Sequence, residues 1–397
     1  MSDIKWQENK MPKTADKNLS IMSIEEVKKA KAFHESFPQY SNTPLAELKE
    51  MSKYLGLGAI KVKDESYRFG LNAFKVLGGS YSMAKYIAQK MGKDVSELPY
   101  DILVSKKLKD EFGQATFFSA TDGNHGRGVA WAANKLGQKC VIFMPKGTTE
   151  IRLNNILKEG ATATIEKYNY DECVRMAADA ASKVKNGVVI QDTAWEGYEE
   201  IPAWIMQGYG TMALESDEQF GEKPTHIFVQ AGVGSLAGAI VGYFSNKYKD
   251  NPPKMIVMEA SAAACLYKGA VAGDGNIRIV DGDLNTIMAG LACGEPNITS
   301  WDILKNHVDC FISAEDIIAA RGMRMLSAPL KGDAQVISGE SGAAPFGALA
   351  TIMLNDEYSE LRKKLDLNSN SKVLLFSTEG DTDPQRWKNI IWEAKNK

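Results

Sequence analysis

Lys75 lies in a setting that suits an amine nucleophile. It stands between Phe74 and Val76 in the segment KVKDESYRFGLNAFKVLGGSYSMAKYIAQK (61–90), just before a glycine pair and a strongly helical stretch. The dipole at a helix N-terminus and partial burial both push a lysine towards its neutral amine. A neutral amine is what Schiff-base chemistry with a carbonyl compound needs. Taken alone, the segment also fits one solvated lysine among many.

A second candidate is the polar turn in SATDGNHGRGVAWAA (119–133), where a strand is expected to end and a helix to begin. Backbone N–H groups from Thr121 to Asn124 can bind an anion such as a carboxylate there. Asp122 and Asn124 are the side chains placed to act on that anion. The alternative is that both are turn and cap residues. His125 resembles a general base, but we expect it to be structural at the helix start.

The segment HIFVQAGVGSLAGAIVGYF (226–244) places Gly232, Gly234 and Ser235 between a buried strand and a helix. This is the geometry of a phosphate cradle made from backbone N–H groups. With Gly238 and the later Glu259, the same glycines also imitate a dinucleotide fingerprint, although the spacing is one residue off G-x-G-x-x-G. A tight turn that packs a helix on a strand is the third possibility.

A fourth segment, KVLLFSTEGDTD (372–383), opens from a buried strand into hydroxyls and acids. Ser377 or Thr378 could hydrogen-bond a heterocycle nitrogen, although the segment alone reads as a polar loop. Four aromatic residues between the second and third segments fall at helix-like spacing: Trp195, Tyr198, Trp204 and Tyr209. We expect these rings to pack or to form a subunit contact rather than to touch a substrate.

The elements that must position these residues alternate between strand and helix. Strands are predicted at ATFFSAT, KCVIFMP, ATATIEK, GVVIQDT, HIFVQAG, KMIVMEA and SKVLLFS. Helices are predicted at HGRGVAWAANKLG, TEIRLNNILKEG, YDECVRMAADAASKV, PAWIMQGYGTMALES and SLAGAIVGYFSNKY. This rhythm indicates βαβ units and an α/β fold with mostly parallel sheets. Such sheets bind ligands past their carboxyl-terminal strand ends, which is where the four segments fall.

Composition excludes several classes of protein. The 397 residues are 44% apolar and 24% charged with a formal net charge of −3, which argues against a nucleic-acid or membrane-surface role. No segment reaches the roughly 20 apolar residues that span a bilayer, and the N-terminus lacks the apolar core of a signal peptide. Five widely spaced cysteines form neither a disulfide framework nor a zinc site. We therefore expect a cytoplasmic protein without a metal site.

Taken together and in this order, the four segments resemble the fold-type II pyridoxal-phosphate enzymes, which include threonine and serine dehydratases. Within that group the chain is most similar to the diaminopropionate ammonia-lyases. The similarity is carried by ESYRFGLNAFKVLGG, ATDGNHGRGVAWAA, QDTAWEGYEEIPAWIMQGY, IMAGLACGEPN, ISGESGA and STEGDTD. It spans residues 43 to 383, nearly the whole chain.

The resemblance implies a set of residues for the cofactor pyridoxal 5′-phosphate. Lys75 would hold the cofactor covalently, Phe74 would lie against its ring, and Asn124 would hydrogen-bond its phenolic oxygen. Ser377 would meet the pyridine nitrogen, and a neutral hydroxyl there favours elimination over transamination. The phosphate would be wrapped by the backbone N–H groups of Gly232, Val233, Gly234, Ser235 and Leu236. Val233 and Ser235 depart from the usual glycine-rich loop, and a backbone cradle tolerates both only if their φ angles are negative.

The resemblance also implies the substrate and the reaction. Thr121 would hold the substrate carboxylate, and Asp122, Asp192 and Glu340 would line an acidic pocket for an amino acid that carries two amines. The expected reaction is α,β-elimination of ammonia from D- or L-2,3-diaminopropionate, which yields pyruvate and two ammonia. Lys75 would serve as base on one face, for the L isomer, and Asp122 on the other, for the D isomer. Asp192 is expected to position the distal amine.

The expected architecture has two interleaved αβα lobes with parallel sheets and the cofactor in the cleft between them. Residues 1–80 with 189–397 would form the large domain and residues 81–188 the small one. By analogy with the family we expect a homodimer. Three alternatives remain open at this stage: a threonine or serine dehydratase, a dinucleotide-dependent dehydrogenase that uses the Gly232 motif, and a non-catalytic binding module.

Overall fold

The computed structural model of this chain describes residues 3–121 and 123–395. The chain divides into two compact units. The first unit consists of Met1–Ile24, Asn42–Asn72 and Met212–Lys397, and the second of Glu25–Ser41 and Ala73–Thr211. Residues 25–41, 73–80 and 189–211 therefore group with the unit that contains 81–188. The domain boundaries expected from the sequence, 80/81 and 188/189, stay a prediction beside this division.

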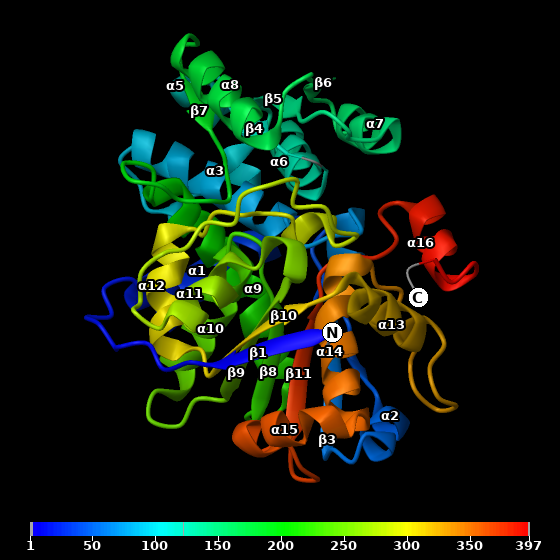
Figure 1. Cartoon of the computed structure of the whole chain (residues 1–397). Helices are drawn as coiled ribbons and strands as arrows, with labels where there is room; N and C mark the ends of the chain where they lie inside the picture. Colours follow the sequence, from blue (N-terminus) through cyan, green and yellow to red (C-terminus); the bar gives the residue numbers. More distant parts are fainter. Residues whose placement is uncertain (1–2, 122, 396–397) are drawn as a thin grey trace. The chain divides into compact units, whose positions relative to one another are not determined.

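The first unit is built on a seven-stranded sheet (Figure 1). Its five inner strands run parallel and its two edge strands run antiparallel to their neighbours. The strand order is β1 (Ile4–Glu8), β10 (Cys310–Ala314), β9 (Lys254–Ala260), β8 (His226–Gln230), β11 (Lys372–Ser377), β3 (Ala59–Asp64) and β2 (Leu45–Glu47). Strands β8 and β10 are buried at every position, as continuous apolar runs in a parallel sheet should be.

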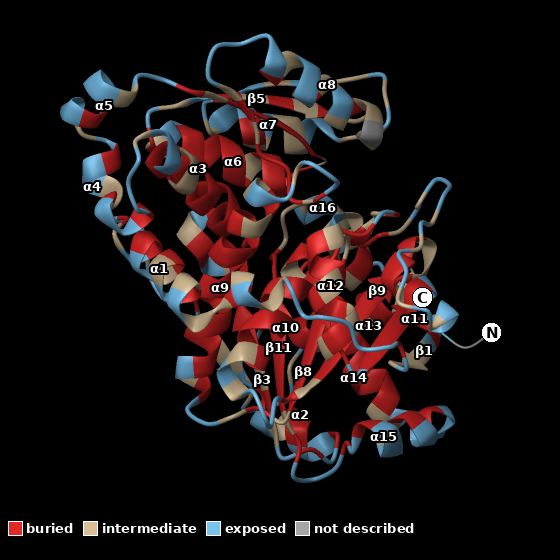
Figure 2. Cartoon of the chain, turned by 90° about the vertical axis from the view of Figure 1, so that its left-hand side faces the viewer, coloured by how far each residue is buried: buried red, intermediate tan, exposed pale blue. Residues whose placement is uncertain are grey.

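Helices α13 and α14 of the first unit pack on each other, and α14 also packs on β8 and β11. In Figure 2, β8, β11 and most of α14 carry the colour of buried residues, whereas α15 presents exposed ones. The helical segments of this unit are η1 (Leu19–Met22), α2 (Lys49–Tyr54), η2 (Glu65–Gly70), α10 (Ser235–Tyr248), η4 (Ser261–Ala263), α11 (Cys265–Ala272), η5 (Ala289–Leu291), α12 (Ile298–His307), α13 (Asp316–Ser327), α14 (Glu340–Leu354), η6 (Asp356–Tyr358), α15 (Ser359–Leu365) and α16 (Pro384–Ile391).

The second unit is built on a four-stranded, fully parallel sheet in the order β6 (Thr162–Ile165), β5 (Lys139–Met144), β4 (Thr116–Ala120) and β7 (Gly187–Val189). Helix α6 packs on β4, β5 and α3, and α8 packs on β4, β5 and β7. Its helical segments are α1 (Ile24–Glu35), α3 (Val76–Lys90), η3 (Val95–Glu97), α4 (Tyr100–Leu103), α5 (Lys106–Phe112), α6 (Asn124–Lys135), α7 (Glu150–Lys158), α8 (Tyr170–Ser182) and the part of α9 (Glu200–Phe220) up to Thr211.

All seven strands and five helices predicted from the sequence are confirmed, and the α/β class with two parallel-sheet lobes is confirmed with them. Four strands, β1, β2, β3 and β10, were not predicted. β1 and β2 are edge strands and β3 mixes lysines with apolar residues, which weakens their signals, whereas β10 is a buried inner strand that was missed. Trp195 and Tyr198 form a two-residue bridge ahead of α9 rather than part of a helix. In the part of the chain that the structure describes, no helix is long and apolar enough to cross a bilayer.

Candidate active site

In the second unit, Lys75 lies at the N-cap of α3 and forms an ion pair with Asp192. The two residues are 117 positions apart in the sequence, and the lysine amine donates a hydrogen bond to the aspartate carboxylate. The side chain of Lys75 is 21% exposed and that of Asp192 is 9% exposed. The helix position alone predicts a neutral amine, but the buried carboxylate supplies the charge partner of an ammonium group. Tertiary structure thus joins two of the residues expected at the site.

Asp192 follows β7 and is held as a charged group. Burial alone would raise the pKa of the Asp192 carboxyl, but the positive charges of Lys75 and His125 bring that pKa well below its ordinary value. His125 Nδ1 lies 3.8 Å from the carboxylate, while its Nε2 donates to the carbonyl of Ile190 at 2.9 Å. The bond to Ile190 supports a structural role for His125, and its other nitrogen faces the charge of Asp192.

Glycines hold the backbone at Lys75 in place. A Cβ atom on Gly128 of α6 would lie 2.7 Å from the nitrogen of Val76 and 3.0 Å from the carbonyl carbon of Lys75. A Cβ atom on Gly208 of α9 would lie 2.4 Å from the carbonyl oxygen of Leu77. Helices α6 and α9 therefore approach the first turn of α3 backbone to backbone, which only glycine permits. The sequence motif around Gly128 positions Lys75 by packing.

The polar turn after β4 is closed by Thr121. The buried Thr121 hydroxyl accepts hydrogen bonds from the N–H groups of Gly123 at 3.0 Å and Gly126 at 3.3 Å. These two N–H groups are thereby engaged within the turn, and among the residues that the structure describes none accepts the hydroxyl hydrogen. Asn124 is the first residue of α6 and is half-buried. Asp122 lies outside the described residues, so its predicted roles stay predictions.

Gln191 was missed by the sequence reasoning, although it directly precedes Asp192. Its buried side-chain amide pairs with both backbone groups of Ala120: it accepts from the N–H at 3.1 Å and donates to the carbonyl at 3.0 Å. It also accepts from the hydroxyl of Ser119 at 3.0 Å. One side chain thus ties the end of β4, where the Thr121 turn begins, to the segment that carries Asp192. The available signal was a polar amide at the end of a buried strand.

In the first unit, the turn between β8 and α10 has the form of an anion cradle. Gly234 is the N-cap of α10 with φ +102°, and a Cβ atom on Gly232 would lie 2.9 Å from the carbonyl oxygen of Gly290. Val233 and Ser235 do not have positive φ, so they meet the condition set for a backbone cradle. The N–H groups in the first turn of a 14-residue helix have no partner four residues back in the same helix, so the start of α10 suits a phosphate.

Asn297, another residue the sequence reasoning missed, fastens this cradle. Its backbone N–H donates to the carbonyl of Val233 at 2.7 Å, and its side-chain amide donates to the hydroxyl of Ser235 at 2.8 Å. The Oδ1 atom of its side chain caps α12 by accepting from the N–H groups of Thr299 at 2.9 Å and Ser300 at 3.1 Å. The N-cap position of an asparagine at the end of ACGEPN was the signal that could have found it.

Ser377 and Thr378 end β11, which neighbours β8 in the sheet. The Ser377 hydroxyl is buried and donates to the hydroxyl of Ser338 at 2.8 Å. The Thr378 hydroxyl accepts from the side-chain amide of Gln230 at 2.7 Å. Gln230 is the last residue of β8, so this bond links the strand before the glycine cradle to the STEGD segment. The choice between Ser377 and Thr378 for a heterocycle nitrogen stays a prediction.

Glu340 stands in the first turn of α14 and forms an ion pair with Arg386 of α16, whose Nε lies 3.1 Å from its carboxylate. This pair gives the carboxylate a structural partner within the first unit and adds no support to its assignment as a substrate contact. The neighbouring Glu379 accepts from the N–H groups of Ser341 at 3.0 Å and Gly342 at 3.1 Å. Glu379 thus caps α14 and fastens the segment that follows Ser377.

Glu259 does not carry out the ribose-binding role that the dinucleotide alternative requires. Its carboxylate accepts from the N–H groups of Leu266 at 2.9 Å and Tyr267 at 2.6 Å, so it caps α11. Burial raises the pKa of Glu259 to about 8, and both of its oxygens are already engaged in capping α11. Cys265 and Cys293 in the same region are not joined by a disulfide.

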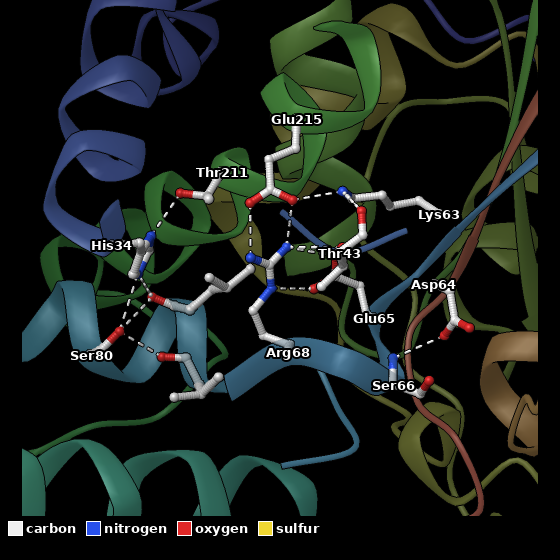
Figure 3. A network of polar contacts seen from close by, with 12 residues as sticks. His34, Thr43, Lys63, Asp64, Glu65, Ser66, Arg68, Ser80, Thr211 and Glu215 are labelled. Carbon is white, nitrogen blue, oxygen red and sulfur yellow. Dashed lines mark hydrogen bonds and ion pairs between the residues drawn. The ribbon is translucent and has the colours of Figure 1, made fainter. Parts of the chain in front are cut away.

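The segment that leads into Lys75 is anchored by a buried charge cluster in the first unit, consisting of Lys63, Glu65, Arg68 and Glu215 (Figure 3). Arg68 donates to Glu65 at 2.8 Å and to both oxygens of Glu215 at 2.7 and 2.8 Å. All four side chains are at most 1% exposed, and their two positive and two negative charges balance. Burial would raise the pKa of Glu215, but the two cations lower it.

A second buried contact in Figure 3 lies within the second unit. His34 of α1 contacts the hydroxyl of Thr211 on α9 at 2.7 Å. Its other ring nitrogen contacts the carbonyl of Leu77 at 3.0 Å and the hydroxyl of Ser80 at 3.1 Å, both on the first turns of α3. This histidine therefore ties α9 to the helix that begins at Lys75.

Comparison with known proteins places this site in a family. The model of the family described as "Pyridoxal-phosphate dependent enzyme" matches residues 37–379. The diaminopropionate ammonia-lyase of Salmonella typhimurium is 50% identical over 370 residues, which are 92% of this chain and 91% of that protein. The chain belongs to the pyridoxal-phosphate-dependent diaminopropionate ammonia-lyase family.

Solved structures of this family agree with the fold. The crystal structure of the Escherichia coli diaminopropionate ammonia-lyase with an aminoacrylate–PLP azomethine reaction intermediate superimposes with a TM-score of 0.88 at 43% identity and covers 99% of this chain and 98% of that one. The structure of the same enzyme with D-serine gives a TM-score of 0.90 at the same identity and coverage. Membership in the family confirms the cofactor and the lyase class expected from the sequence, and it contradicts the dinucleotide-dependent dehydrogenase.

Proposed function

We propose that this chain catalyses the α,β-elimination of ammonia from 2,3-diaminopropionate. With one water molecule, the substrate yields one pyruvate and two ammonia. The proposal is supported by relatives that bear this activity in their names at up to 50% identity. The observation that carries it is the buried Asp192 carboxylate on the amine of Lys75, because this is a site built for an ammonium group.

The residues present fit pyridoxal phosphate. An aldehyde with a phosphate group requires a primary amine and a set of N–H donors. The chain offers the amine of Lys75 at a helix start, a glycine turn whose Gly232 has no room for a Cβ atom, and the first turn of α10. Lys75 would hold the aldehyde carbon, and the cradle 232–236 would hold the phosphate. Asn124, Phe74 and Ser377 would contact the ring. When bound, the cofactor supplies an electron sink that stabilises negative charge at the substrate Cα.

Asp192 would select the substrate by charge. Beside the ammonium of Lys75, which with His125 brings the pKa of Asp192 well below its ordinary value, the carboxylate is ionised and is a partner for a cation. Once the amine of Lys75 is engaged by the cofactor, this carboxylate is left to a second ammonium group. Diaminopropionate carries such a group at Cβ, whereas serine and threonine carry a hydroxyl there. The same contact keeps the leaving nitrogen protonated, which it must be to depart as ammonia.

Proton removal at Cα requires a base on the face of the substrate where the proton lies. The amine of Lys75, released when substrate binds, would serve one face, for the L isomer. Asp122 would serve the other face, for the D isomer, and this assignment rests on the family resemblance. Thr121 has a hydroxyl hydrogen left to donate, which suits the substrate carboxylate. The assembly expected is a homodimer in the cytoplasm, and sedimentation of the purified holoenzyme would test the dimer.

A direct test uses the purified holoenzyme. Its visible spectrum should show the absorbance of the lysine-bound cofactor, and borohydride should remove this absorbance and fix the cofactor to the peptide that contains Lys75. Incubation with D- and L-diaminopropionate should release ammonia and pyruvate in a ratio of two to one. Faster turnover of serine or threonine than of diaminopropionate would contradict the proposed substrate. A protein without bound cofactor and without turnover would favour a binding module instead.

A further inference from the structure

Tyr209 of α9 has a buried hydroxyl group that makes no hydrogen bond to any described residue. The residue is 1% exposed, and its hydroxyl has no hydrogen-bond partner among residues 3–121 and 123–395. Leaving a buried hydroxyl unpaired destabilises a folded protein, and a phenylalanine of the same shape would avoid the cost. A buried polar group without a partner needs an explanation, and next to an active site a ligand that supplies the partner is one.

The ring of Tyr209 is fixed against the helix turn that begins at Lys75. On α9, the neighbouring Gly208 lies backbone to backbone with Leu77 and Gly78 of α3. A Cβ atom on Gly78 would lie 2.7 Å from Cε1 and 3.0 Å from Cζ of the Tyr209 ring, so the end of the ring that bears the hydroxyl presses on this turn. The Tyr209 ring also packs against the ring of Phe74. The two ring centroids lie 4.7 Å apart, and the ring planes make an angle of 51°.

The charges of the site act on this hydroxyl. Burial raises the pKa of Tyr209, while the ammonium of Lys75 lowers it and the carboxylate of Asp192 raises it again. Both charged groups of the candidate active site are therefore within electrostatic reach of the phenol. With the pKa raised overall, the phenol keeps its proton at neutral pH and can donate it to an acceptor.

We propose that Tyr209 is a ligand-binding residue of this site, whose hydroxyl donates a hydrogen bond to an oxygen or nitrogen acceptor of the molecule bound at Lys75. This rests on the proposed function and adds to it a neutral donor next to the ion pair. It departs from the expectation that the four aromatic residues, Tyr209 among them, pack or form a subunit contact rather than touch a substrate. Two sources carry a suitable acceptor: the cofactor, and the carboxylate of the amino-acid substrate.

The chain offers a matched control in Tyr81. This tyrosine of α3 is also fully buried, and its hydroxyl also has no partner in the described part of the chain. The charges that act on it are those of Glu26 and Asp94 rather than those of the active site. Tyr81→Phe therefore reports what removal of a buried, unpaired hydroxyl does to the protein when no ligand is involved.

The experiment compares Tyr209→Phe, Tyr81→Phe and the unaltered holoenzyme. The measurements are the absorbance and fluorescence of the bound cofactor, its dissociation constant, and kcat and KM for diaminopropionate. Tyr209→Phe should lower kcat/KM about tenfold or more, as expected for the loss of one donor to a polar ligand, while Tyr81→Phe leaves it unchanged. Without cofactor, the Tm of both variants should equal or exceed that of the unaltered protein, so that a loss of activity is not a loss of folding.

The two sources of the acceptor are separated by the readouts. A shifted cofactor spectrum or weaker cofactor binding in Tyr209→Phe assigns the acceptor to the cofactor. An unchanged spectrum with a raised KM assigns it to the substrate. Equal behaviour of Tyr209→Phe and Tyr81→Phe in every measurement would overturn the proposal. Failure of the proposed function is distinct, since the unaltered holoenzyme would then release no pyruvate from diaminopropionate.

Discussion

Asp192→Asn is the substitution that most directly tests whether the site needs the negative charge of Asp192. It removes the negative charge at nearly constant volume and leaves an amide oxygen that can still accept from Lys75. A hydrogen bond to a charged group contributes about 1.5–3 kcal/mol, against about 1 kcal/mol for a neutral one. Because Lys75 is 21% exposed and the pair is partly screened, we expect a stability loss of about 1–2 kcal/mol at neutral pH.

The effect on activity should exceed the effect on folding. The variant lacks the charge that would pair with the second ammonium of diaminopropionate, so kcat/KM for this substrate should fall roughly tenfold to a hundredfold. D-Serine, which the Escherichia coli relative binds, has no second ammonium, and its dissociation constant should change little. The assay is pyruvate release from D- and L-diaminopropionate, together with spectral titration of the holoenzyme with D-serine.

The pH dependence of stability follows from the lowered pKa of Asp192. A carboxyl whose pKa in the folded chain lies below its ordinary value of 3.8 stabilises the fold at every pH above that value. This contribution of Asp192 to stability is lost as the pH falls through the lowered pKa that the carboxyl has in the folded chain. The difference in Tm between the unaltered protein and Asp192→Asn should therefore be constant above about pH 5 and should narrow on acidification below the ordinary value.

Asp217→Asn is the matched control for this substitution. Asp217 is a buried aspartate of similar exposure, 7%, and its carboxylate accepts from the hydroxyls of Tyr243 at 3.0 Å and Tyr248 at 2.6 Å. Its loss should lower Tm without changing the preference for diaminopropionate over D-serine. If Asp192→Asn kept the same preference as the unaltered protein, the assignment of Asp192 to the distal ammonium would be refuted.

Three further substitutions test other parts of the site. Gly232→Ala introduces a Cβ atom 2.9 Å from the carbonyl oxygen of Gly290, so the turn must shift. The dissociation constant of the cofactor should therefore rise about tenfold. Unchanged cofactor binding would show that this turn does not hold the phosphate. Glu215→Gln leaves two buried cations with one carboxylate. It should lower the free energy of unfolding, measured by urea denaturation, by about 3–5 kcal/mol. A change below about 1 kcal/mol would show that the charge cluster is not needed for stability. Asp122→Asn should lose activity on D-diaminopropionate far more than on the L isomer, and equal losses would assign Asp122 to binding or to the leaving group.

Local sequence was sufficient for seven strands, five helices and the chemical types of the site. The run Ile227–Val229, between His226 and Gln230, is apolar without alternation, which predicts a strand buried on both faces, and β8 is that strand. The glycines after it predict a cradle at the start of a helix, and α10 begins after Gly234. These features depend on side-chain periodicity and on the backbone freedom of glycine, and both can be read over a few neighbouring residues.

Contacts between residues that lie far apart in the sequence could not be predicted in this way. Glu259 has the spacing of a ribose-binding acid, but the fold turns it to cap α11. Glu340 has the position of a pocket acid, but α16 brings Arg386 to it. In both cases the partner is chosen by how helices pack on the sheet, and a carboxylate accepts any donor that packing presents.

The sequence by itself determined that this chain is an α/β protein with a candidate amine nucleophile, an anion-binding turn and a family likeness in six ordered segments. Only the tertiary structure decided that Asp192 pairs with Lys75 across 117 residues and that Gly128 and Gly208 approach the backbone at that lysine. It alone also shows that the hydroxyl of Tyr209 is buried with no partner among the described residues. The physical reason is that residue type and period are local properties, whereas charge pairing, close backbone approach and desolvation arise from which elements pack together.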